Sequence, residues 1–425
     1  MANPSLKNKI TPTAAFFAIP DEVKTLLNRL RDHGHEGYLV GGCVRDALRG
    51  VIPKDYDMTT SATPDEIHEA FADRRMIDTG IAHGTVTVLW EKKPYEITTY
   101  RVDGDYHDSR HPDAVRFTPN LGEDLARRDF TMNALAYHPD EGVYDAFGGI
   151  ADIQSGIIRA VGDPARRFEE DALRILRALR FAAVLGFEID PDTALAARGR
   201  SHGLLAISAE RVREELVKLL TGDHAATVLA EYADILAVRL PDWYAATSAF
   251  GGIQRLTAPF PYLPFDPCAR LAAFLLPLTA DTAKETLNAL RFDHRTRDRV
   301  LKLLSHFDTP YASDERALRR FTAGLGGRDA LLLLSLHEAM ARATENEEGL
   351  AVISEAKTGV ERLVAGGLCS SIAELAVGGD DLIALGYKKG RVVGDALRRL
   401  LDAVLDGAVK NEKEALLSLA RALLP

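Results

Sequence analysis

Cysteine is scarce in this chain, and long apolar runs are missing. Only three cysteines occur among 425 residues, Cys43, Cys268 and Cys369, and none forms a CxxC pair. A disulfide framework or a cysteine-rich zinc site is therefore not expected, and a reducing compartment fits best. No window reaches the roughly 18 uninterrupted apolar residues of a membrane span. Residues 1–20 also lack the cationic and apolar pattern of a secretory signal. We therefore expect a soluble, cytoplasmic protein with no membrane partner.

Basic residues are fewer than acidic residues. The chain has 52 Lys and Arg against 62 Asp and Glu, a formal net charge of −10. This balance excludes a general nucleic-acid coat, whose affinity comes from a net positive field, but it leaves room for a locally basic groove. Hydrophobic residues make up 46% of the chain, enough to build sizeable cores. At about 100–200 residues per domain, the length suggests two to four domains.

The hydrophobic pattern changes along the chain. The first part contains short β-rich runs at residues 38–40, 84–90 and 95–100, interleaved with helical patterns such as residues 64–71. From about residue 164 onward the pattern is helical, with strong helices expected over 168–185 and 208–220. No repeat of fixed period occurs. The sequence therefore predicts an α/β head with a mixed sheet, followed by a long all-helical region.

Two glycines stand where an apolar run ends, in the stretch Leu-Val-Gly-Gly-Cys-Val-Arg-Asp at residues 39–46. Without side chains, Gly41 and Gly42 let backbone N–H groups approach a phosphate closely. Arg45 follows on the first turn of the expected helix, where a guanidinium suits a triphosphate. We expect Gly42 and Arg45 to bind phosphates, and Asp46 to have a structural role beside a basic neighbour.

An acidic pair, Asp55 and Asp57, follows nine residues later. If residues 55–59 form a strand, both carboxylates project from the same face, because side chains alternate along a strand. Paired carboxylates repel each other unless a divalent cation neutralises them, which predicts a Mg²⁺ site. Taken alone, a Gly-Gly pair indicates only a tight turn, and Asp-x-Asp indicates only a solvated loop. The order and close spacing of the two motifs favour a functional site over these structural interpretations. Glu96 is a candidate third carboxylate, and could equally face outward from a half-exposed strand.

These motifs resemble the signature of class II tRNA nucleotidyltransferases and bacterial poly(A) polymerases. Three later stretches strengthen the resemblance: Arg-Arg-Asp-Phe-Thr-Met-Asn-Ala at 127–134, Glu-Asp-Ala-Leu-Arg at 170–174, and Glu-Arg-Val-Arg-Glu-Glu at 210–215. The motifs cover about residues 38–220 in the family's order. The resemblance implies a polymerase-β-like head at residues 1–155, a base-recognising helical neck at 156–225, and a body and tail at 226–425 that bind tRNA.

The resemblance also assigns roles to particular segments. It implies that Arg128 binds the ribose and triphosphate, for which a planar guanidinium is well suited. Residues 101–112 resemble the flexible loop of enzymes that add A as well as C. Residues 386–394, with Lys388, Lys389 and Arg391, resemble a tail that holds the tRNA elbow. A basic surface turn before a core helix is an equally good interpretation of that last segment.

One predicted helix carries Asp171, Arg174, Arg177 and Arg180 at three-residue spacing, so that the four side chains share a stripe. An ordinary amphipathic helix shows similar spacing. An acceptor at Asp171 and a donor at Arg174 would match the exocyclic amine and ring nitrogen of C or A. U and G reverse both partners, so this pair could select CTP and ATP without a nucleic-acid template. Arg177 and Arg180 are expected to hold phosphates or line the pocket.

The leading hypothesis is a CCA-adding tRNA nucleotidyltransferase that adds C, C and A to the tRNA 3′ end from CTP and ATP, with Mg²⁺ as cofactor and release of pyrophosphate. A poly(A) polymerase of the same superfamily is the alternative, as is an enzyme that adds only part of CCA. A non-catalytic RNA-binding protein is a third possibility, disfavoured because Asp55 and Asp57 are both present. The sequence leaves monomer and homodimer equally open.

Overall fold

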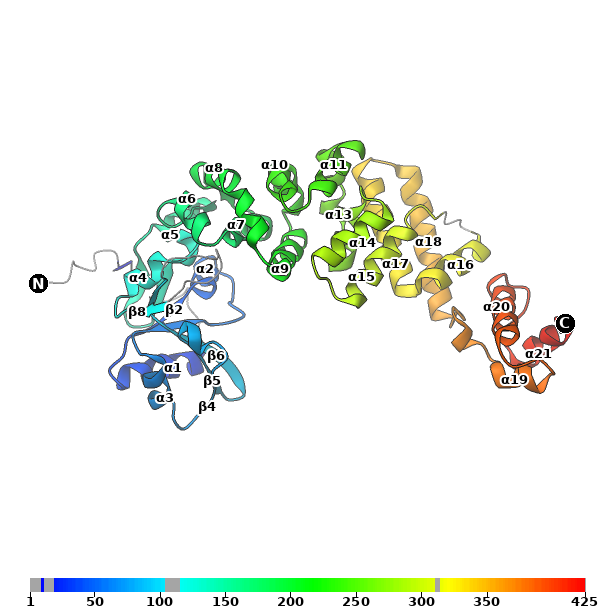
Figure 1. Ribbon diagram of the computed structural model, residues 1–425, viewed down its shortest axis with the longest axis horizontal. Coiled ribbons are helices and arrows are strands. Elements are labelled where there is room, and N and C mark those ends of the chain that lie inside the picture. The colour runs from blue at the N-terminus through cyan, green and yellow to red at the C-terminus, as the bar shows by residue number, and fades with distance from the viewer. Residues whose placement is uncertain (1–8, 11–18, 104–114, 310–313, 425) are drawn as a thin grey trace, which may run out of the picture. The chain divides into compact units, whose positions relative to one another are not determined.

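The computed structural model describes residues 9–10, 19–103, 115–309 and 314–424 (Figure 1). The chain divides into two compact units. The first comprises Met1–His224 and Asp234–Arg239, and the second Ala225–Ala233 and Leu240–Pro425. Every strand lies in the first unit, and helices dominate the described chain after it. The predicted class, a mixed α/β head followed by a helical region, is therefore confirmed.

The head is built on an eight-stranded sheet of order β1-β10-β9-β2-β3-β6-β5-β4. Its strands are β1 (Lys9–Ile10), β2 (Gly37–Val40), β3 (Met58–Thr60), β4 (Arg75–Ile77), β5 (Thr85–Trp90), β6 (Lys93–Thr99), β9 (Leu135–His138) and β10 (Gly142–Asp145). Strands β3 and β6 run parallel, and their neighbours pair antiparallel. A separate antiparallel pair joins β7 (Arg101–Asp103) to β8 (Val115–Phe117). The predicted runs at 38–40, 84–90 and 95–100 correspond to β2, β5 and β6.

Short helices flank this sheet. Helices α1 (Asp21–Asp32) and α3 (Pro64–Ala70) lie side by side against it (Figure 1). A capping box between Thr63 and Glu66 starts α3 and satisfies two backbone N–H groups that the helix leaves unpaired. The remaining helical elements of the head are α2 (Gly42–Leu48), η1 (Ile81–His83), α4 (Leu121–Ala126), η2 (Thr131–Asn133) and α5 (Gly149–Ser155).

The acidic pair does not lie in a strand, and this part of the sequence prediction is wrong. Strand β3 begins at Met58, immediately after Asp57. Its partner β2 ends at Val40, because the chain turns at Gly41, so the antiparallel ladder with β2 stops there. The last contact is the Val40 N–H donating to the Asp57 carbonyl at 3.0 Å. Asp55 and Asp57 therefore occupy the irregular segment that leads into the strand.

The helix predicted over residues 168–185 is two helices. Helix α6 (Pro164–Glu170) ends before Asp171, which is extended at φ −145° and ψ 103°, and α7 (Leu173–Leu185) follows. The Asp171 carboxylate accepts from the Leu173 N–H at 3.0 Å, and such local side-chain bonding competes with helix continuation. Asp171 therefore does not share a helix with Arg174. The rest of this region is β11 (Ile157–Ile158), β12 (Glu188–Ile189), α8 (Pro191–Gly199), η3 (Ser201–Ala206) and α9 (Ala209–Leu220).

The second unit is helical in its described residues. After α10 (Ala225–Ala237), which spans the division between the units, its elements are α11 (Pro241–Ala249), α12 (Ile253–Thr257), η4 (Phe260–Tyr262), α13 (Pro267–Leu275), α14 (Ala280–Ala289), α15 (His294–Ser305), α16 (Glu315–Leu325), α17 (Gly327–Ala343), α18 (Glu347–Ala365), η5 (Ile372–Glu374), α19 (Gly379–Ala384), α20 (Arg391–Leu405) and α21 (Lys413–Ala422). In the part of the chain that is described, no helix is both long and apolar enough to cross a membrane.

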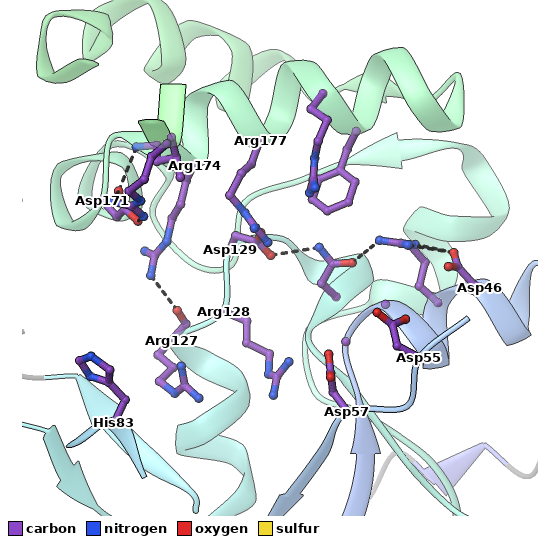
Figure 2. A pocket seen from close by; sticks show the side chains of 18 of the residues that line it. Asp46, Asp55, Asp57, His83, Arg127, Arg128, Asp129, Asp171, Arg174 and Arg177 are labelled. Atoms are coloured by element: carbon purple, nitrogen blue, oxygen red, sulfur yellow. Dashed lines mark hydrogen bonds and ion pairs between the residues drawn. The ribbon is translucent and has the colours of Figure 1, made fainter. Parts of the chain in front are cut away.

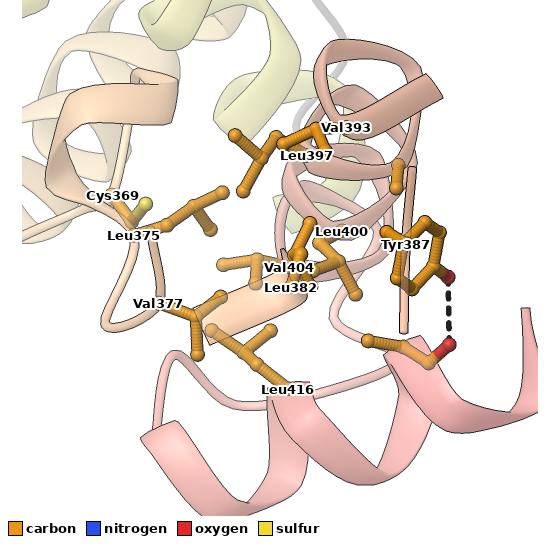
Figure 3. Close-up of a cluster of buried hydrophobic side chains, with 12 residues drawn as sticks. Cys369, Leu375, Val377, Leu382, Tyr387, Val393, Leu397, Leu400, Val404 and Leu416 are labelled. Carbon is orange, nitrogen blue, oxygen red and sulfur yellow. Dashed lines mark hydrogen bonds between the residues drawn. The ribbon is translucent and has the colours of Figure 1, made fainter. Parts of the chain in front are cut away.

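The last three helices enclose a hydrophobic core of their own (Figure 3). Leu382, Leu400 and Leu416, one from each helix, are fully buried there. The Tyr387 hydroxyl donates to the Ala420 carbonyl at 2.7 Å, which ties the segment before α20 to α21. The basic residues predicted to bind tRNA therefore sit on a turn that is anchored at one end to this core.

Two valines of α20 test this core. Val404 is 4% exposed within the core, whereas Val392 is 41% exposed on the same helix. Val404→Ala should weaken the tail core by about 2 kcal/mol, from lost apolar transfer and the cavity left behind. Val392→Ala should change it by less than about 0.5 kcal/mol. Hydrogen exchange of the α19–α21 amides measures both, and equal effects of the two substitutions would contradict the assigned core.

Candidate active site

A cavity of about 840 Å³ opens in the first unit, within the usual size range of small-molecule sites (Figure 2). All nine residues predicted for the site line it: Gly42, Arg45, Asp55, Asp57, Arg128, Asp171, Arg174, Arg177 and Arg180. They come from the sheet head and from the helices that follow it, so the fold joins segments more than a hundred residues apart. The roles assigned to these nine residues remain predictions.

The cavity wall is strongly basic. Eight arginines line it against five aspartates, although the chain as a whole carries a net charge of −10. Guanidinium groups bind phosphate oxygens through charge-assisted, often bidentate hydrogen bonds. The wall therefore suits a polyanionic ligand such as a nucleoside triphosphate.

Asp55 and Asp57 lie together on the sheet side of the cavity (Figure 2). Burial raises the pKa of Asp57 to about 6, with further contributions from the charges of Asp55 and Glu96, while Arg128 opposes the shift. Glu96 acts from outside the cavity wall: it is exposed on β6, one position before Ile97, which pairs with Met58. The charged form of Asp57 is therefore disfavoured, first by burial and then by the neighbouring carboxylates, and a bound cation would stabilise it.

The donor set of the site is two carboxylates. Asp55 and Asp57 present carboxylate oxygens, the ligands that hard divalent cations prefer. Among the described residues, no group of three or more His, Cys, Asp or Glu side chains is arranged to hold a metal ion. The residues present therefore fit a cation that takes its remaining ligands from water and a bound phosphate, as Mg²⁺ does in nucleotide sites.

A glycine turn lies between the acidic pair and Arg128. Gly41 has φ +74°, and a Cβ at this position would lie 3.2 Å from the Arg128 Nη1. Only glycine adopts this backbone without strain and also leaves room for the guanidinium. The turn sends the chain from β2 into α2, so that Gly42 and Arg45 face the cavity beside Arg128.

A chain of hydrogen bonds joins α2 to α7 across the cavity (Figure 2). The Arg45 Nη1 donates to the Asn133 Oδ1 at 2.8 Å, and the Asn133 Nδ2 donates to the Asp129 Oδ1 at 3.1 Å. The Arg177 Nη2 donates to the Asp129 Oδ2 at 2.6 Å. Burial alone would raise the pKa of Asp129, but Arg177 and the hydrogen bonds lower it to about 2. Asp129 therefore stays ionised and holds both arginines in place.

The acceptor Asp171 and the donor Arg174 are brought to the same cavity although they do not share a helix. The Arg211 Nη2 donates to the Asp171 Oδ2 at 2.7 Å, which holds the carboxylate from α9. Arg174 is buried, and its Nη2 donates to the Arg127 carbonyl at 3.0 Å. Both groups are therefore held in fixed orientations by the protein.

Phe181 is surrounded by guanidinium groups. The Arg180 Cζ lies 3.9 Å from the ring centroid, and the corresponding distances for Arg45 and Arg177 are 5.2 and 5.6 Å. Arg180 also forms an ion pair with the buried Glu215, Nε to Oε2, at 3.0 Å. The negative face of the ring helps to accommodate three cations in close proximity.

Sequence reasoning missed several residues of this wall, namely His83, Arg101, Asn133, Phe181 and Arg211. Arg211 and Asn133 fall inside the stretches that carry the family resemblance, so they could have been proposed from it. His83 lies in the short η1, where no motif marks it, and its carbonyl accepts from the Arg101 Nη1. Of the predicted flexible loop at 101–112, residues 104–112 lie outside the described residues.

Three family models match successive parts of the chain. Residues 37–159 match the "Poly A polymerase head domain", and residues 186–242 match the "Probable RNA and SrmB- binding site of polymerase A". Residues 269–420 match the "tRNA nucleotidyltransferase domain 2" model. The first match covers the sheet from β2 onward, the glycine turn and the pair Asp55 and Asp57. These matches identify the chain as a nucleotidyltransferase.

Similarity to individual proteins extends along nearly the whole chain. It is 37% identical over 397 residues to the CCA-adding enzyme of Lactobacillus helveticus, covering 92% of this chain and 94% of the relative. It is 50% identical over 208 residues to the enzyme of Leuconostoc mesenteroides, covering 49% and 51%. The crystal structure of the Bacillus stearothermophilus CCA-adding enzyme in complex with CTP has a TM-score of 0.82 and 32% identity, covering 95% and 97%. The chain belongs to the CCA-adding enzyme family.

The raised pKa of Asp57 predicts a pH-dependent stability in metal-free protein. Between the ordinary value of 3.8 and about 6, the folded state holds a proton that the unfolded state releases, so this group lowers stability as pH rises through that range. Asp57→Asn should therefore raise the melting temperature in EDTA at about pH 7, and the gain should vanish below about pH 4. The gain should be small, because Asp57 keeps an exposed surface at which solvent screens its charge, even though partial burial of the carboxyl raises its pKa.

Thermal unfolding of both proteins across this pH range measures the effect. Asp65→Asn is a matched control, because Asp65 is an exposed aspartate of α3 outside the cavity. A gain at about pH 7 that is equal for the two variants, or no gain for Asp57→Asn, would contradict the raised pKa of Asp57.

Proposed function

We propose that this protein adds C, C and A to the 3′ end of tRNA from CTP and ATP, with release of pyrophosphate and without a nucleic-acid template. The observation that carries the proposal is one cavity that combines two carboxylates, a wall of arginines, and an acceptor-donor pair able to read a base edge. Membership of the CCA-adding enzyme family supports the same activity. The three buried, unpaired cysteines suit a cytoplasmic enzyme.

The proposed division of labour is a catalytic head at residues 1–155, a neck at 156–225 that selects the base, and a body and tail at 226–425 that bind tRNA. In its support, the cavity residues all precede the third segment, ending at Arg211. The match of residues 269–420 to a tRNA nucleotidyltransferase domain supports a tRNA-binding role for the helices. Lys388, Lys389 and Arg391 are exposed beside the start of α20 and could contact the phosphate backbone.

Asp55 and Asp57 would hold Mg²⁺ through their carboxylate oxygens. When bound, the ion would lower the pKa of the RNA 3′ hydroxyl and neutralise charge on the departing pyrophosphate. The two carboxylates orient the reacting groups from the sheet side of the cavity, and a bound cation would stabilise the charged form of Asp57. The backbone of the protein fixes where the carboxylate oxygens of Asp55 and Asp57 lie relative to the glycine turn.

The triphosphate would lie against the basic wall. The turn at Gly41 brings the Gly42 backbone and the Arg128 guanidinium together, so that both reach the same phosphates. Arg45 and Arg177 approach from α2 and α7, linked through Asp129. Because this framework is held by buried hydrogen bonds, little reorganisation is needed when the charged substrate enters.

The base would be read by Asp171 and Arg174. The carboxylate accepts from the exocyclic amine of C or A, and the guanidinium donates to the adjacent ring nitrogen. Three of the five Arg174 N–H groups are used on protein acceptors, which leaves donors for a base. With U or G, the carboxylate would face a carbonyl oxygen and the guanidinium would face a ring N–H. Each unsatisfied group would then cost about 1–3 kcal/mol of binding free energy.

The first test uses tRNA that lacks its terminal CCA. With CTP and ATP together the wild-type protein should restore CCA, and with CTP alone it should add C residues; sequencing the 3′ ends measures both. Asp55→Ala should reduce incorporation by about 1000-fold, since the cation contributes several kcal/mol. Asp65→Ala, outside the cavity, should have no effect.

Two results would contradict these assignments. Long A tails made from ATP alone, without incorporation of C, would identify a poly(A) polymerase, the enzyme named in the description of the head-domain model that residues 37–159 match. Full activity of Asp55→Ala would show that the carboxylate pair does not hold the catalytic cation.

A second test concerns base choice. Asp171→Asn preserves the size of the side chain and the acceptor for the Leu173 N–H, but it replaces a carboxylate oxygen with a donor. Discrimination of CTP against UTP should fall by about tenfold or more, while affinity for the triphosphate changes less. Steady-state kinetics with each of the four nucleotides measure both. Asp163→Asn, the cap of α6 outside the cavity, is the matched control. Equal losses for all four nucleotides would rule out side-chain reading of the base.

A further inference from the structure

Asp124 is a fully buried carboxylate that lies just behind the cavity wall. It is 0% exposed, sits in α4, and is not among the residues that line the cavity. Its Oδ1 accepts from the Arg127 Nη2 at 2.7 Å and Nε at 3.0 Å, and from the Arg101 backbone N–H at 3.3 Å. Its Oδ2 accepts from the Arg128 Nη2 at 3.3 Å, and the Thr59 hydroxyl lies 3.4 Å from the same oxygen.

These contacts come from three elements that meet at the site, although the Thr59 hydroxyl donates to the Thr98 carbonyl at the shorter distance of 3.0 Å. Thr59 lies in β3, two residues after Asp57, and Arg101 begins β7. Arg127 and Arg128 follow the end of α4, and both line the cavity. One anion therefore holds both wall arginines beside the start of the strand that follows the carboxylate pair.

The charge of Asp124 is retained in spite of its burial. Burial raises the pKa of a carboxyl group, but the charges of Arg127 and Arg128 outweigh this and lower the pKa of Asp124 below its usual value. An ionised group with no exposed surface is stable only when its oxygens are saturated with donors. The donors to Asp124 come from residues of the cavity wall. The burial of the Asp124 charge therefore requires these arginines, and the arginines in turn are oriented by Asp124.

We propose that Asp124 is a positioning residue for nucleotide binding: without touching the substrate, it holds Arg128, and through it the triphosphate, in the reactive orientation. The inference rests on the proposed function, since it assumes that Arg128 binds the triphosphate. An arginine side chain has considerable rotamer freedom, and a buried carboxylate removes that freedom before the substrate arrives. Arg127 is fixed in the same way, and its carbonyl in turn accepts from Arg174 of the base-reading pair.

The test is a double-mutant cycle between Asp124 and Arg128 in the full chain. Asp124→Asn keeps the shape but presents an amide where Arg128 needs an acceptor. The KM for CTP and ATP should rise about tenfold, the usual effect of losing a hydrogen bond to a charged group. In an Arg128→Ala background, Asp124→Asn should raise the KM by less than about threefold, because only its contact with Arg127 is then left to lose.

Val23→Ala separates positioning from stability. Val23 is 0% exposed in α1 and lies outside the cavity, so its truncation lowers the melting temperature without reaching the arginines. The KM for CTP should remain at the wild-type value in this variant. A rise in KM like that of Asp124→Asn, or independent effects of Asp124→Asn and Arg128→Ala that multiply in the double variant, would overturn the proposal.

Asp124→Glu keeps the inference testable if the amide variant does not fold. It retains the charge but moves the oxygens by one methylene, so the KM for CTP should rise by an intermediate factor, again only when Arg128 is present. A wild-type KM for this variant would overturn the proposal. Calorimetric titration with CTP distinguishes the two levels of inference. Wild-type protein that binds CTP but does not extend tRNA contradicts the proposed function, whereas equal CTP affinity in wild type and Asp124→Asn contradicts the role of Asp124.

Discussion

The pairing of arginines with carboxylates is the interaction on which the cavity depends. Arginines of its wall form ion pairs with carboxylates of the chain: Arg45 with Asp46, Arg127 and Arg128 with Asp124, Arg174 with Glu170, Arg177 with Asp129, Arg180 with Glu215, and Arg211 with Asp171. Cations packed this closely repel one another and lose hydration, so they could not be held in one wall without internal counter-charges. These carboxylates sit behind or between the guanidiniums, which leaves the positive groups directed to the cavity.

Local patterns predicted the residues of the site better than their partners. Gly42, Arg45 and the acidic pair are marked by a few neighbouring residues, and the helical region was visible in periodicity. Local patterns did not predict the roles of Asp124 and Asn133, because these roles come from contacts with distant segments. One example is the hydrogen bond between Asn133 and Arg45. The break at Asp171 was missed since helical periodicity continues across it, and only the capping bond to the Leu173 N–H reveals it.

Net charge and local charge have separate origins in this molecule. The excess of acidic residues is spread over the whole chain. The arginines of the cavity are brought together because the head packs against α7 and α9. A polyanion therefore meets a local excess of positive charge in the cavity although the chain as a whole is acidic. Attraction of this kind weakens as salt concentration rises.

The interruption between α6 and α7 has a geometric consequence. Had the helix continued, Asp171 and Arg174 would have been separated by a fixed distance along a rigid rod. With Asp171 extended between the helices, its carboxylate accepts from the Leu173 N–H of α7 and from Arg211 of α9, and its carbonyl accepts from the Arg174 N–H at 3.0 Å. The interruption thus makes Asp171 the residue at which α6, α7 and α9 are joined, so a change at this one position would disturb the packing of all three helices.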